Sequence, residues 1–139
     1  TDITGLSATF PTGLSNNTLY YWRVSGVNGA GNGAFSNTAS FTTIGIPTLQ
    51  TPANAAINVA VNPTFTWNAA AGATSYSIEI STDPSFTTLS PQSQTNVQAT
   101  NYTVGSNLAA ATVYYWRVKA VNSVTGASKT SGTFSFTTN

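Results

Sequence analysis

The fold is decided by Leu108-Ala-Ala-Ala-Thr-Val-Tyr-Tyr-Trp-Arg-Val-Lys-Ala-Val-Asn122, a stretch that occurs twice in the chain. Its first copy is Leu14-Ser-Asn-Asn-Thr-Leu-Tyr-Tyr-Trp-Arg-Val-Ser-Gly-Val-Asn28, which lies 94 positions earlier. Both copies continue through a stretch rich in Gly, Ser and Asn to a Phe-Thr-Thr sequence, which begins at Phe41 and at Phe136. A tandem array of modules with a period of about 95 residues explains both repeats.

The chain of 139 residues spans about one and a half of these periods. The boundary falls at Ile44-Gly45-Ile46-Pro47, where the proline restricts the residue before it and predicts a short, stiff linker. We therefore expect the C-terminal half of a module at 1–44, with about three strands, and a complete module at 45–139.

Apolar residues in the complete module alternate with a period of two, which is typical of half-buried strands. The alternation is clearest at 75–81 and at 113–121, the longest segment. Strands are predicted at 48–51, 56–61, 64–67, 75–81, 101–104, 113–121 and 133–136, with a loop and a marginal strand at 89–98. The turn at 83–86 directs Phe86 back onto the core, and Lys129 is expected in a loop.

The inward-facing positions predict the structural core of both copies. They are Leu14, Tyr20 and Trp22 in the first copy, and Trp67, Tyr76, Leu108, Tyr114 and Trp116 in the complete module. Roughly seven short strands in one module predict an all-β, two-sheet antiparallel sandwich.

With these residues the sequence resembles the fibronectin type III family, and in particular the tandem modules of bacterial extracellular proteins. Trp67 and Tyr76 match its aromatic positions on the second and third strands, and Leu108 begins its most specific motif, Leu, Thr, then Tyr-x-aromatic-x-Val-x-Ala. The first copy departs from the motif at Gly26, where alanine is usual, and the second copy lacks the proline that commonly follows the leucine. The resemblance implies an immunoglobulin-like sandwich in which the hydroxyl of Tyr114 caps backbone upstream.

Charge is scarce: four basic and three acidic residues make up 5% of the chain, where roughly 25% is typical. His, Cys and Met are absent, which excludes disulfides, thiol nucleophiles and His-dependent catalysis or metal binding. Glu79 and Asp83 are the only neighbouring carboxylates, and their strand and turn positions favour structural roles. We expect a non-enzymatic protein with no cofactor, no metal, no nucleic-acid partner and no membrane insertion.

Four surface residues are candidates for an interaction: Tyr21, Tyr115, Arg23 and Arg117. Outward tyrosines can stack on sugar rings, but a tyrosine packed on its sheet neighbours with a cation–π contact to arginine is favoured. Asn16 and Asn101 begin Asn-x-Thr sequons and are candidates for glycosylation.

The half module at 1–44 poses a physical problem, because its inward residues lack the opposite sheet. Tyr20, Trp22, Val24 and Phe41 would be uncovered, and the strand edges would be unpaired. We expect this part to be ordered only where another chain or another module covers its apolar face.

Three functional hypotheses follow. The leading one is a structural spacer in a tandem array of sandwiches on an extracellular or cell-surface protein of bacterial origin, with neighbouring modules or other chains as partners. The second is a subunit of an extracellular filament or sheath that self-associates through low-charge surfaces and open strand edges. The third is a carbohydrate-binding accessory module of a secreted hydrolase, with a glycan as partner.

Overall fold

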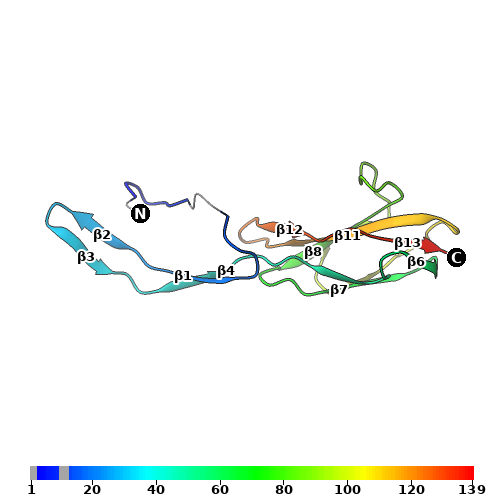
Figure 1. Cartoon of the computed structure of the whole chain (residues 1–139), viewed down its shortest axis with the longest axis horizontal. Helices are drawn as coiled ribbons and strands as arrows, with labels where there is room; N and C mark the ends of the chain where they lie inside the picture. Colours follow the sequence, from blue (N-terminus) through cyan, green and yellow to red (C-terminus); the bar gives the residue numbers. More distant parts are fainter. Residues whose placement is uncertain (1–2, 10–12) are drawn as a thin grey trace.

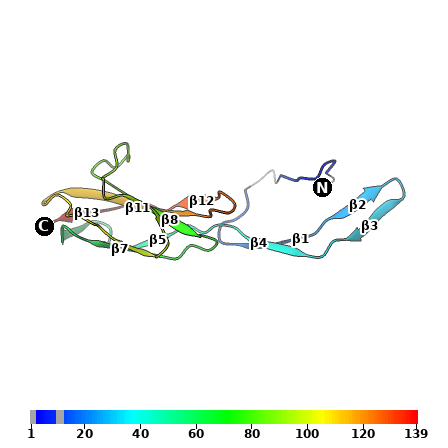
Figure 2. The same cartoon turned by 180° about the vertical axis from the view of Figure 1, so that it is seen from behind.

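The computed structural model describes residues 3–9 and 13–139, and every regular element within them is a β-strand. Two parts follow one another along the long axis of the molecule: a narrow pair of hairpins formed by β1 to β4, and a sandwich formed by β5 to β13 (Figure 1). The view from behind shows the same arrangement (Figure 2). The prediction of an all-β protein is confirmed.

The sandwich consists of a three-stranded and a six-stranded sheet. The smaller sheet has the order β10-β7-β5, made of β5 (Thr48–Thr51), β7 (Thr64–Asn68) and β10 (Asn101–Thr103). The larger sheet has the order β6-β13-β11-β8-β9, with β12 also paired to β11. Its strands are β6 (Ala56–Val59), β8 (Ser75–Ser81), β9 (Gln94–Val97), β11 (Val113–Val121), β12 (Ser128–Thr130) and β13 (Phe134–Thr138).

One strand pair departs from the antiparallel pattern. Pro52 ends β5 in the smaller sheet, since proline has no N–H for the ladder. The chain then crosses to the larger sheet, where β6 pairs with β13 in parallel and Ala56 lies opposite Phe136. All other strand pairs of the described chain are antiparallel, so the sandwich closes at this edge with a single parallel pair.

The hydrophobic core lies between the two sheets. Phe65 of β7 packs edge-on against Trp116 of β11, with ring centroids 4.9 Å apart, and Trp67 packs against Tyr76 at 5.5 Å. All five core residues expected in the complete module are buried, namely Trp67, Tyr76, Leu108, Tyr114 and Trp116. The alternation of apolar residues thus places one face of each central strand in the core.

Two local predictions in the sandwich are wrong. Lys129 lies in a strand, β12, whose three residues are all polar and exposed, so no apolar alternation marks it. Only its backbone pairing with Lys119–Val121 reveals this strand. Phe86 is buried, but it lies outside the core cluster, and its ring covers Arg117 on the outer face of the larger sheet.

The first part of the chain consists of two linked hairpins. β1 (Leu19–Trp22) pairs with β4 (Ala39–Thr42), and β2 (Ser25–Asn28) pairs with β3 (Gly31–Phe35). Leu14 and Tyr20 are half-buried, but Trp22 is 50% exposed and does not form part of a core. The assignment of Trp22 to a core is therefore corrected, because in the described chain no second sheet covers this face.

Candidate interaction surfaces of the first hairpins and the junction

Both copies of the repeat build the same tyrosine contact. The hydroxyl of Tyr114 accepts a hydrogen bond from the amide of Ala109 at 3.1 Å. The hydroxyl of Tyr20 accepts one from the amide of Ser15 at 3.0 Å. In each case the phenol oxygen satisfies a backbone donor five residues upstream, as the resemblance to fibronectin type III modules implies.

A serine divides the long hairpin into two segments in both copies. The hydroxyl of Ser131 accepts from the amide of Val118 at 3.0 Å and donates to the carbonyl of Gly132 at 2.7 Å. Ser36 accepts from Val24 and donates to the following residue in the same way, at 3.1 and 2.9 Å. The local hydrogen bonding of the two hairpins is therefore equivalent.

Burial, not local geometry, distinguishes the two copies. Trp116 and Val118 are completely buried in the sandwich. Their equivalents Trp22 and Val24 are 50% and 49% exposed. Phe41 is 40% exposed, whereas its equivalent Phe136 is 1% exposed. The first hairpins thus present a side-chain face of core composition to the outside.

The arginines of the two copies differ in their partners. Nε of Arg117 donates to Oε2 of Glu79 on the neighbouring strand at 2.6 Å, and its guanidinium lies over the ring of Phe86. Arg23 lies 4.0 Å over the ring of Phe35 on β3. Within residues 3–9 and 13–139, no carboxylate forms an ion pair with Arg23. Among the described residues, the second copy therefore has an ion pair that the first copy lacks.

The two candidate tyrosines do not come together. Tyr21 is 68% exposed on β1, while Tyr115 is half-buried on β11 of the larger sheet. They belong to separate sheets, and the arginines next to them stack on phenylalanines and not on these tyrosines. The four predicted surface residues thus lie in two separate places, one in each copy of the repeat, and in each place the arginine packs on a phenylalanine ring.

Both sequon asparagines lie at exposed positions. Asn16 lies in the turn before β1, where its carbonyl accepts a hydrogen bond from the hydroxyl of Thr18 at 2.9 Å. Asn101 begins β10 at the edge of the smaller sheet, opposite Thr66. Glycosylation at either asparagine stays a prediction.

The linker between the two parts is fastened to the sandwich. Ile44 is 7% exposed and belongs to the core cluster of the sandwich. The amide of Gly45 donates to the carbonyl of Ala71 at 2.8 Å. Asn122 adds a contact between loops, because its side-chain amide donates to the carbonyl of Gly72 at 2.7 Å.

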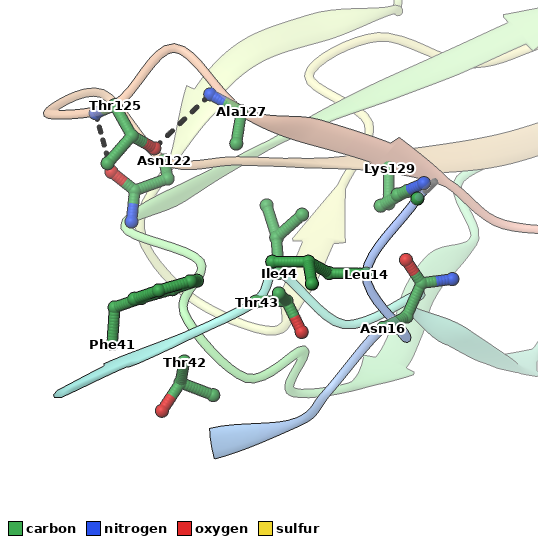
Figure 3. Close-up of a pocket in the computed structure, with 11 residues that line it drawn as sticks. Leu14, Asn16, Phe41, Thr42, Thr43, Ile44, Asn122, Thr125, Ala127 and Lys129 are labelled. Atoms are coloured by element: carbon green, nitrogen blue, oxygen red, sulfur yellow. Dashed lines mark hydrogen bonds between the residues drawn. The ribbon is translucent and has the colours of Figure 1, made fainter. Parts of the chain in front are cut away.

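A groove of about 500 Å³ lies beside this linker. Figure 3 shows that its walls come from the segment before β1, from β4 and from the loop between β11 and β12. Asn16, Phe41, Ile44 and Asn122 are among the residues that line it, and Lys129 is the only charged residue among the described ones in its wall. The described wall thus offers a cation and side-chain amide groups and contains no carboxylate.

Neither metal-binding clusters nor membrane-spanning helices occur in the described part of the chain. No three His, Cys, Asp or Glu residues lie close enough there to bind a metal ion, and no helix is long and apolar enough to cross a membrane.

The carboxylate of Asp83 stabilises the turn in which it lies. It accepts hydrogen bonds from the hydroxyl of Thr87 and from the amides of Ser85 and Thr87, and these bonds lower the pKa of the carboxyl below its ordinary value of 3.8.

The sandwich is similar to known immunoglobulin-like modules. A family model described as the Rha78A-like, N-terminal immunoglobulin domain matches residues 51–139. The crystal structure of a Fn3-like protein from Clostridium thermocellum superimposes with a TM-score of 0.51 at 29% identity, covering 70% of this chain and 93% of that one. No curated protein matches the chain. The chain therefore belongs to the family of Rha78A-like, N-terminal immunoglobulin domains.

Proposed function

We propose that the chain is a non-catalytic structural spacer from a tandem array of β-sandwich modules in a secreted or cell-surface bacterial protein. The observation that carries this proposal is the junction, where Ile44 is buried in the sandwich and Gly45 is hydrogen-bonded to Ala71. A spacer requires that successive modules keep a defined direction, and a linker with buried, hydrogen-bonded residues provides this better than a flexible one.

Two further observations support the proposal. The repeated hairpin has equivalent hydrogen bonds in both copies, as expected for neighbouring modules of one array. The matching family is described as an N-terminal domain, which is a module attached to further parts of a longer protein. The polar surface, rich in Thr, Ser and Asn, suits a module that separates its neighbours without binding a ligand.

A distance measurement between the two parts tests the spacer. The chain has no cysteine, so Ala30→Cys and Asn139→Cys introduce the only two labelling sites for a donor and an acceptor dye. We expect a single narrow distance distribution, which broadens when four Gly-Ser residues are inserted between Gly45 and Ile46. A distribution that is already broad in the uninserted chain would argue against a stiff spacer.

A filament or sheath subunit is the second candidate. Low charge and the exposed apolar side chains of the first hairpins, such as Trp22 and Val27, favour self-association. Sedimentation of the chain over a wide concentration range separates the two candidates, since a filament subunit grows into large assemblies and a spacer stays a discrete species.

A further inference from the structure

The tip of the hairpin between β2 and β3 carries the sequence Asn28-Gly29-Ala30-Gly31-Asn32-Gly33, in which an asparagine twice precedes a glycine. Asn28 ends β2 and pairs with Gly31, so that Gly29 and Ala30 form the turn. All six residues are exposed. Asparagine is among the thermolabile residues, and a glycine after it has no Cβ to shield the backbone nitrogen that can attack the side-chain amide.

The side chain of Asn28 is held over its own turn. Its Oδ1 accepts a hydrogen bond from the amide of Ala30 at 2.9 Å. This contact folds the side chain back over the Gly29 peptide, which removes part of the rotational freedom that ring closure would otherwise cost. The same amide donates to the oxygen on which negative charge develops when the side-chain carbonyl is attacked, so the hydrogen bond also stabilises the tetrahedral intermediate.

The two nitrogen atoms that take part in such an attack are not engaged elsewhere in the described chain. Neither the backbone amide of Gly29 nor Nδ2 of Asn28 forms a hydrogen bond to another described residue. A Cβ atom added at Gly29 would meet no atom of another described residue within 4 Å. The attacking nitrogen and the leaving group are therefore both accessible to solvent.

The equivalent asparagine of the second copy lacks this freedom. Oδ1 of Asn122 likewise accepts from an amide two residues later, that of Val124, at 3.0 Å. However, Nδ2 of Asn122 donates to the carbonyl of Gly72 at 2.7 Å, and the amide of Ser123 donates to Oγ1 of Thr74 at 2.9 Å. Both nitrogen atoms are thus bound at this position. The repeat therefore contains a reactive asparagine and its protected equivalent.

The second Asn-Gly pair of the hairpin lies within a strand. Asn32 is opposite Val27 in the register of β2 and β3, and Gly33 follows it in the same strand. A Cβ atom at Gly33 would lie 3.4 Å from the carbonyl oxygen of Gly26 across the hairpin. Ring closure here requires the backbone to leave its paired conformation, so the asparagine reacts only when the hairpin opens locally.

We propose that Asn28 is a site of spontaneous deamidation in the folded protein, with solvent water as the co-reactant. The Gly29 amide loses its proton to hydroxide, and its nitrogen forms a bond to Cγ of Asn28. The bond between Cγ and Nδ2 then breaks, and the leaving nitrogen takes a proton from water and departs as ammonia, which leaves a succinimide. Water opens this ring at either carbonyl and gives aspartate or isoaspartate.

The product changes both the charge and the backbone of the hairpin tip. It places a carboxylate at the end of β2, in a part of the chain where Arg23 is the only charged residue among the described ones. Isoaspartate also lengthens the backbone by a methylene group at the position that pairs with Gly31. This modification goes beyond the spacer proposal and does not depend on it, because a stiff junction is not required for the turn to react.

Peptide mapping of the whole chain by mass spectrometry tests the site directly. After incubation in mildly alkaline buffer, chymotrypsin yields the segment 23–35, which contains both Asn-Gly pairs, and an unincubated sample corrects for conversion during digestion. In the folded chain we expect Asn28 to convert about tenfold or more faster than Asn32, and Asn122 to stay unconverted. In guanidinium chloride, Asn28 and Asn32 should convert at similar rates. Equal rates in the folded chain, or faster conversion of Asn32, overturn the proposal.

Two glycine variants test the ring mechanism. Gly29→Ala shields the attacking nitrogen and should slow the conversion of Asn28 about tenfold or more, while the matched control Gly33→Ala should leave it unchanged. The added Cβ at position 29 meets open space, so this variant should fold, which circular dichroism checks. The unaltered chain should yield isoaspartate as well as aspartate, because a succinimide opens at both carbonyls. An unchanged rate in Gly29→Ala, or aspartate as the sole product, would show that Asn28 does not react by this route and would refute the proposal.

Discussion

The guanidinium of Arg117 lies 4.1 Å above the ring of Phe86, and this contact places an aromatic ring on the outer face of the larger sheet. Glu79 holds the same arginine from its neighbouring strand. Phe86, which lies in the loop after β8, thus packs on the outward side chain of Arg117 on β11, and Glu79 on β8 pairs with the same arginine.

Removing the ring of Phe86 should weaken this packing. Phe86→Leu retains most of the apolar volume but loses the cation–π contact, so we expect a loss of about 1 kcal/mol in the free energy of unfolding. A double-mutant cycle with Arg117→Gln, measured by urea unfolding, should show coupling between the two residues. Additive effects would mean that the contact contributes nothing of its own.

The two tryptophans of the repeat provide a matched pair. Trp116→Ala removes a completely buried ring and should cost about 3–5 kcal/mol of the unfolding free energy of the sandwich. Trp22→Ala removes a half-exposed ring and should cost about 1 kcal/mol or less. Urea unfolding followed by far-UV circular dichroism measures both. Similar losses would show that the first hairpins bury Trp22 in solution.

The tyrosine hydroxyls should contribute unequally to stability. Tyr114→Phe leaves the amide of Ala109 without its acceptor in a partly buried site and should cost about 1 kcal/mol. In Tyr20→Phe, water can replace the lost acceptor at the exposed amide of Ser15, so the loss should be smaller. Amide exchange rates at Ala109 and Ser15 report the two bonds separately, and unchanged protection at Ala109 would contradict this assignment.

Gly45 should be intolerant of a side chain. A Cβ atom at this position would lie 2.9 Å from the backbone nitrogen of Ala71, closer than van der Waals contact permits. Gly45→Ala should therefore displace the linker and break the hydrogen bond between Gly45 and Ala71. The matched control is Gly13→Ala, where no atom of another described residue lies within 4 Å of the added Cβ. The distribution of interatomic distances obtained from small-angle X-ray scattering should broaden for Gly45→Ala and stay unchanged for Gly13→Ala.

Acid should destabilise the sandwich through Asp83. Hydrogen bonds from Thr87 and Ser85 lower the pKa of its carboxyl below 3.8, so the native state favours the charged form. The resulting stability is present above about pH 4 and is lost as the pH falls through the lowered native pKa. The chain has no histidine, so we expect a nearly flat stability profile from there to neutral pH. Asp83→Asn should reduce the fall of the melting temperature as the pH is lowered below about 4. If the melting temperature of the variant falls as steeply as that of the unaltered chain, another group causes the acid destabilisation.

Sequence patterns located the strands wherever packing imposes a period of two. The segments at 75–81 and 113–121 agree with β8 and β11 in both bounds, because one face of each is buried. β12 was missed because three exposed polar residues carry no such signal. The position of Phe86 was misassigned for a related reason: an apolar residue after a turn can cover either face of the sheet, and only the loop path selects the outer one.

The sequence by itself determined the fold class, the repeat and the separation of inward from outward residues, since these depend on spacing along the chain. Only the tertiary structure decided which residues of the repeat are covered. Trp22 and Trp116 lie in the same sequence context and share the same local hydrogen bonds, yet one is half-exposed and the other fully buried. Burial depends on strands that are distant in sequence, and so do the partners of Arg117, which are Glu79 and Phe86.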